Sequence, residues 1–140
     1  MKLFLDTSVL LAAAGSTQGA SRFVLEQTRR KEWELLTAQY CVDEAKRNIS
    51  KLGARAVTTL GAIVMPALRV VSTKLAFDKV LVFPKAKDRP VLLSALGCEA
   101  DFLLTLDETD FQGVIGNRIY NMEIRSPGQF LLEMRTAGLI

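Results

Sequence analysis

The chain has 140 residues, a net charge of +3 and 49% hydrophobic residues, which suits one folded domain. Histidine is absent, so serine–histidine–aspartate and cysteine–histidine nucleophiles and histidine-ligated zinc sites are excluded. The two cysteines, Cys41 and Cys98, are too few for a four-cysteine zinc site or a disulfide scaffold, and we expect two free, buried thiols. Any catalysis must therefore use carboxylates, cationic side chains, hydroxyls or a metal bound through oxygen.

The apolar N-terminus looks like a signal peptide only superficially, because Asp6 interrupts it. No apolar stretch reaches about 18 residues without a charge, so we expect no membrane span and a cytoplasmic protein.

Short apolar strands alternate with helical segments along the chain. The expected strands are Lys2–Leu5, Glu34–Ala38, 69–72, 101–106 and 121–124. The expected helices are 9–14, 20–31, 39–52, 55–68, 88–96 and 126–135. Thr7 or Ser8 is expected to cap the first helix and Gly53 to stop the third. The alternation predicts a single α/β domain over residues 1–140, a three-layer sandwich with a mostly parallel central sheet.

Acidic residues stand where expected strands end or the adjoining helices begin. Four of them, far apart in the sequence, are expected at one rim of the sheet: Asp6, Glu44, Asp88 and Asp107. Glu108 and Asp110 are close enough to join them. Because ligands collect at the carboxyl ends of parallel strands, these side chains are candidates for one site.

A cluster of carboxylates repels itself and favours a neutralising cation. Oxygen ligands select Mg²⁺ or Mn²⁺ over zinc, and such centres perform phosphoryl chemistry. Each acid also has a structural interpretation. Asp6 and Asp88 would be helix caps, and the solvated surface residues would be Glu44, Asp107, Glu108 and Asp110. Asp43 and Asp101 look purely structural.

Three segments resemble the PIN domain family. MKLFLDTSVLLAA resembles its opening strand–aspartate–helix motif, and DRPVLLSALGCEADFLLTLDETDF resembles its second half. SPGQFLLEM resembles the terminal helix of prokaryotic PIN proteins that are toxins of toxin–antitoxin pairs. The resemblance covers essentially the whole chain, although Lys87 and Arg89 flank Asp88 where relatives often carry acids and asparagine.

The resemblance implies a parallel sheet with flanking helices and a Mg²⁺- or Mn²⁺-dependent ribonuclease. It places metal-binding and catalytic acids at Asp6, Glu44, Asp88 and Asp107, with Asp110 as an additional ligand and Asp43 as the rival of Glu44. Ser8 and Thr105 match supporting residues. It further implies RNA as substrate, an antitoxin partner and a homodimer, for which the apolar segment 54–68 is a candidate contact face.

The charge distribution agrees with a polyanionic partner. Residues 22–89 contain 14 basic and 7 acidic residues, whereas residues 90–140 contain 3 and 7. Two alternatives remain: a catalytically silent module that binds RNA or a protein, and a haloacid-dehalogenase-type phosphatase with a strand-end aspartate as nucleophile. The phosphatase usually needs a second acid two residues later, where this chain has Ser8.

Overall fold

The structure, a computed structural model, describes residues 1–28, 30–72, 89–107 and 116–140. Its sheet has the strand order β3-β2-β1-β4-β6-β5. The strands are β1 (Lys2–Leu5), β2 (Glu34–Ala38), β3 (Arg69–Val71), β4 (Phe102–Leu104), β5 (Arg118–Ile119) and β6 (Met122–Arg125). Every pairing is parallel except that of β5 with β6. The predicted α/β fold with a mostly parallel sheet is confirmed.

The strand register aligns the carboxyl ends of the three central strands. Leu5 of β1 lies opposite Leu104 of β4, which lies opposite Arg125 of β6. The backbone N–H of Asp6 donates to Leu104 O at 3.0 Å, and that of Thr105 donates to Arg125 O at 3.0 Å. The residues that follow β1 and β4 therefore emerge side by side at one rim.

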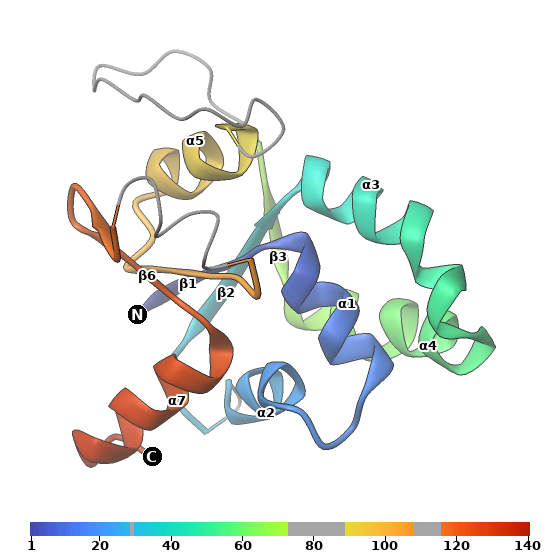
Figure 1. Cartoon of the computed structure of the whole chain (residues 1–140), viewed down its shortest axis with the longest axis horizontal. Coiled ribbons are helices and arrows are strands. Elements are labelled where there is room, and N and C mark those ends of the chain that lie inside the picture. The colour runs from blue at the N-terminus through green and yellow to red at the C-terminus, as the bar shows by residue number, and fades with distance from the viewer. Residues whose placement is uncertain (29, 73–88, 108–115) are drawn as a thin grey trace.

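Helices cover both faces of the sheet (Figure 1). They are α1 (Thr7–Gly15), α2 (Ala20–Gln27), α3 (Gln39–Asn48), α4 (Ala54–Thr59), α5 (Arg89–Gly97) and α7 (Pro127–Thr136). Helix α1 contacts α2, α3 and α4, and α2 contacts α7. Helix α5 packs on β2, and Figure 1 shows it across the sheet from α1, α2 and α7. None of the described helices has the length and apolar character needed to cross a membrane.

Aromatic side chains join the C-terminal helix to the sheet. Phe130 of α7 is fully buried, with its ring centroid 5.1 Å from that of Trp33 and 5.0 Å from that of Phe102 in edge-to-face geometry. Helix α7 begins with a capping box, in which Ser126 and Gln129 exchange side-chain-to-backbone hydrogen bonds. The expected start at Ser126-Pro127 is thus confirmed.

Several element ends differ from the expectations. The first helix begins at Thr7 with Asp6 as its N-cap, rather than at residue 9 behind a Thr7 or Ser8 cap. The expected helix 20–31 ends at Gln27, where the N–H of the C-cap residue Thr28 bonds to Leu25 O, three residues back, and tightens the last turn.

The expected helix 39–52 is α3 followed by a 3₁₀ turn, Ile49–Leu52. Gly53 stops it with φ +98°, a backbone conformation that favours glycine. The expected helix 55–68 is instead α4, a π-helical turn (Leu60–Val64) and a 3₁₀ turn (Met65–Ala67). Pro66 lacks the N–H that would continue an α-helix there.

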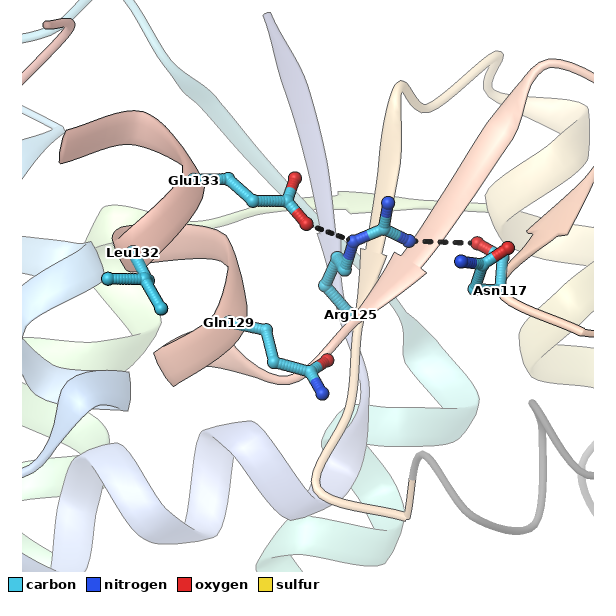
Figure 2. A pocket seen from close by; sticks show the side chains of 5 residues that line it. All are labelled: Asn117, Arg125, Gln129, Leu132 and Glu133. Carbon is cyan, nitrogen blue, oxygen red and sulfur yellow. Dashed lines mark hydrogen bonds and ion pairs between the residues drawn. The ribbon is translucent and has the colours of Figure 1, made fainter. Parts of the chain in front are cut away.

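Arg125 joins β6 to helix α7 and to Asn117 in a pocket shown in Figure 2. Its guanidinium donates to Asn117 O at 2.9 Å and to Glu123 at 2.6 Å, and it pairs with Glu133 of α7. Partial burial alone would lower the pKa of Arg125, but the hydrogen bonds and charges of Glu133 and Glu123 outweigh it and raise the pKa. Arg125 therefore stays charged and fixes the end of β6. Its own backbone carbonyl accepts the N–H of Thr105.

Candidate active site

Asp6 lies at the carboxyl end of the central strand β1 and is 6% exposed. The chain is extended at this residue and turns into α1 immediately after it. The backbone N–H of Thr7 donates to Asp6 Oδ1 at 2.8 Å, which is the cap of the helix. Asp6 therefore caps helix α1, as the sequence suggested. A capping role alone does not require its other carboxylate oxygen to be held as well.

Two hydroxyl groups fix the other carboxylate oxygen of Asp6. Thr105 Oγ1 donates to Oδ2 at 2.8 Å, and Ser8 Oγ approaches it at 3.4 Å. Each hydroxyl also accepts a backbone N–H from the segment after β4: Asp107 N–H bonds to Thr105 Oγ1 and Leu106 N–H to Ser8 Oγ, both at 3.0 Å. Asp6 and the backbone of Asp107 are thus held in one network.

Helix α3 is attached to this network through Thr7. The buried Thr7 hydroxyl donates to Cys41 O at 3.3 Å in the first turn of α3. Glu44 lies one helical turn further along the same helix. The contact therefore sets the position of Glu44 relative to Asp6.

The Cys41 thiol is free and buried beside Asp6. Burial raises the pKa of this thiol to about 11, and the negative charge of Asp6 contributes to the rise. Cys41 thus stays a neutral thiol at physiological pH. Cys98 is also free but only half-buried, so the expectation of two buried thiols holds fully for Cys41 alone.

A groove of about 500 Å³ opens between α1 and α3. We call it the α1–α3 groove; its lining residues are Thr7, Ser8, Leu11, Ala12, Glu44, Asn48, Lys51, Leu52 and Asp107. Glu44 and Asp107 are separated by more than sixty residues of sequence, yet they line the same groove as Ser8, which contacts Asp6. The structure therefore gathers Asp6, Ser8, Glu44, Thr105 and Asp107 in one region.

The other acids have different positions. Asp43 is exposed and accepts a hydrogen bond from Gln39, so the groove is lined by Glu44 and not by its rival. Asp101 accepts the backbone N–H of Lys2 at 2.7 Å at the beginning of β1, away from the rim that carries Asp6. Asp88, Glu108 and Asp110 lie outside the described residues.

Within the described ranges, no three acidic or cysteine side chains are grouped closely enough to hold a metal ion. The described acids Asp6, Glu44 and Asp107 offer only oxygen donors, which is the chemistry that Mg²⁺ and Mn²⁺ prefer. The region can therefore contribute carboxylate ligands to a hard cation.

The sequence did not lead us to three contributions to this region: Asn48, Lys51 and the hydroxyl contact of Thr7. Asn48 and Lys51 line the groove at positions four and seven residues after Glu44. This spacing places them on one helical face, which is a signal that the sequence already contained. The contact of the Thr7 hydroxyl with α3 had no such signal, because it joins segments 34 residues apart.

The family model described as the PIN domain matches residues 2–109. The protein belongs to the PIN domain family. The matched part contains Asp6, Glu44, Thr105 and Asp107. A comparison with curated proteins finds no match. Membership of the PIN domain family argues against the haloacid-dehalogenase-type phosphatase.

Solved structures with the same PIN fold include VapBC2 from Rickettsia felis bound to a DNA fragment from its promoter. That match has a TM-score of 0.62 and 15% identity, and it covers 89% of this chain and 98% of the other. VapC20 from Mycobacterium tuberculosis, a toxin that cleaves the Sarcin-Ricin loop, matches with a TM-score of 0.54 and 17% identity over 80% of this chain and 94% of the other. Both share the fold of this PIN domain.

Proposed function

We propose that this PIN domain protein is a metal-dependent endoribonuclease that acts as the toxin of a toxin–antitoxin pair. The observation that carries the proposal is the network that holds the Asp6 carboxylate at the end of the central strand, beside a groove lined by Glu44 and Asp107. Family membership adds weight, as does the RNA-cleaving activity named for the similarly folded VapC20.

In this proposal Asp6, Glu44, Asp88 and Asp107 hold Mg²⁺ or Mn²⁺, with Asp110 as an additional ligand. Once bound, such an ion lowers the pKa of a coordinated water and stabilises negative charge on a phosphate. The chain's own contribution is positioning: Thr105 and Ser8 orient Asp6 Oδ2, and the Thr7 N–H orients Oδ1. Histidine is absent, so a carboxylate is the protein group available to accept a proton.

The partners follow from the same proposal. The fold shared with VapBC2 supports an antitoxin as partner. An RNA substrate supports a site of action in the cytoplasm. A homodimer is supported by apolar side chains exposed on segment 54–68, where Val57 is 45% and Ile63 49% exposed. The other face of that segment belongs to the hydrophobic core, because Ala56, Leu60 and Val64 are buried.

The proposal is tested with a labelled single-stranded RNA and the purified protein. We expect cleavage with Mg²⁺ or Mn²⁺ and none with EDTA, and products that carry 3′-hydroxyl and 5′-phosphate ends. Cleavage that persists in EDTA would show that the activity does not depend on a metal.

A catalytically silent PIN module is the second candidate, because Lys87 and Arg89 flank Asp88 and their positive charges would weaken metal binding there. Calorimetric titration with Mn²⁺ separates the two. Binding at millimolar metal supports the nuclease, whereas no binding together with no cleavage supports the silent module.

Thr105→Val is expected to lower Mn²⁺ affinity and kcat by about 10- to 100-fold with a small change in KM. The change removes the donor to Asp6 and the acceptor of the Asp107 N–H at nearly constant volume. Thr105→Ser keeps the hydroxyl and should restore most of the activity. Calorimetry and steady-state kinetics measure both effects.

Thr37→Val is the matched control. Thr37 is as deeply buried as Thr105, but its hydroxyl donates to Leu5 O at 2.8 Å rather than to a carboxylate. Thr37→Val should lower the free energy of unfolding by about 1–3 kcal/mol without changing metal affinity. An equal loss of affinity in both variants would mean that Thr105 acts only through general stability.

A further inference from the structure

The α1–α3 groove is lined by side chains of opposite charge at different positions. The acids Glu44 and Asp107 line it together with the Ser8 hydroxyl, whereas the cation Lys51 lies seven residues after Glu44. These seven residues span the end of α3 and the 3₁₀ turn that follows it, so Lys51 lies about two helical turns beyond Glu44. The groove therefore carries a negative region, which a metal ion would neutralise, and a positive charge further along it.

Lys51 is held in position by a neutral amide. Asn48 Nδ2 donates to Glu44 O at 2.8 Å, which turns the amide oxygen outward, and Lys51 Nζ donates to that oxygen at 3.1 Å. In the described part of the chain, Lys51 forms no ion pair with a carboxylate. Its charge is thus positioned in the groove, and no acidic side chain among the described residues pairs with it.

Apolar side chains also line the groove. Leu11 and Ala12 of α1 are half-buried, and Leu52 is 50% exposed. Such a surface suits the face of a ribose or a base, and none of the described lining residues carries an aromatic ring for stacking. Binding here would depend on phosphate charge more than on base identity.

We propose that Lys51, positioned by Asn48, binds a backbone phosphate of the RNA strand in the α1–α3 groove, displaced along the groove from the phosphate that is cleaved. The inference rests on the proposed ribonuclease function. It makes Lys51 a residue that positions the substrate and gives it no part in the chemical step. An acidic protein segment is the competing ligand, and the experiment below distinguishes it from RNA.

Binding is measured in EDTA, where no metal-dependent cleavage occurs, by fluorescence anisotropy of a labelled single-stranded RNA of about a dozen nucleotides. A salt series that begins at low ionic strength keeps weak binding measurable. We expect Lys51→Gln to weaken binding about fivefold and to reduce the slope of log K against log[salt] by about 0.7, the loss of one phosphate contact. Lys51→Arg should retain most of the affinity.

Lys46→Gln is the matched control, because Lys46 lies on α3 and is exposed but does not line the groove. Asn48→Ala keeps the charge of Lys51 but releases it, and should weaken binding about twofold. Where cleavage is measured, Lys51→Gln should raise KM with little change in kcat. Equal weakening by Lys46→Gln and Lys51→Gln, or no detectable binding by the unaltered protein at low salt, would overturn the proposal.

The competing ligand is tested with a labelled polyglutamate peptide of similar length. Binding of this peptide that requires Lys51, with RNA binding that does not, would also overturn the proposal. Lys51-dependent RNA binding by a protein that cleaves no RNA with any divalent metal would sink the ribonuclease function alone, since the phosphate contact is measured without cleavage.

Discussion

Asp6→Asn is expected to abolish metal-dependent RNA cleavage while the protein stays folded. Removing one charged ligand from a proposed carboxylate centre should lower kcat by about a hundredfold or more. The fold should persist because the amide oxygen of asparagine can still accept the Thr7 N–H. The new NH₂ group can donate to the hydroxyls of Thr105 and Ser8 once these rotate. The nuclease assay and circular dichroism check the two halves of this prediction.

Asp43→Asn is the matched control for that variant. It makes the same chemical change at an exposed carboxylate one residue before Glu44, outside the groove. Its activity should equal that of the unaltered protein within about twofold. Full cleavage by Asp6→Asn would refute the assignment of Asp6, and loss of cleavage in Asp43→Asn would favour Asp43 over Glu44 as the ligand.

Phe130→Ala is expected to cost about 3–5 kcal/mol of unfolding free energy, out of a total of about 5–15 kcal/mol for a domain of this kind. The ring is fully buried between Trp33 and Phe102, so its removal leaves a cavity and two aromatic contacts are lost. Urea unfolding followed by tryptophan fluorescence measures the change, since Trp33 is the sole tryptophan.

Leu132→Ala provides the comparison on the same helix. Leu132 is 64% exposed, and its loss should cost less than about 0.5 kcal/mol. Similar costs for both variants would show that α7 is held by helix formation and not by the packing of Phe130.

The strands next to the centre of the sheet were the most predictable part of the fold. Lys2–Leu5 and Glu34–Ala38 are short apolar runs because helices bury both faces of the sheet there, and their bounds agree with the prediction. Strand β5 was missed because it has only two residues and its turn places Tyr120 at φ +52°, without the glycine that usually marks a hairpin. The irregular turns within 54–68 were missed because apolar periodicity does not distinguish α, π and 3₁₀ backbones.

The candidate site was predictable to the extent that it depends on strand ends. Parallel strands deliver the residues after β1 and β4 to the same rim, which is why Asp6, Thr105 and Asp107 lie near one another. The sequence did not decide whether Asp43 or Glu44 faces the site, because that depends on the rotation of α3 about its axis. A tertiary hydrogen bond from Thr7 helps to set this rotation. Lys51 looked like any solvated lysine until Asn48 and the groove were visible.

The hydrogen bond between Thr105 and Asp6 joins residues 99 positions apart. During synthesis the ribosome therefore delivers the first carboxylate long before the hydroxyl that orients it. Over that whole interval β1 also lacks its β4 neighbour, so a partly translated polypeptide carries Asp6 without its completed surroundings. Activity that depends on this network can begin only after both Thr105 and strand β4 have left the ribosome.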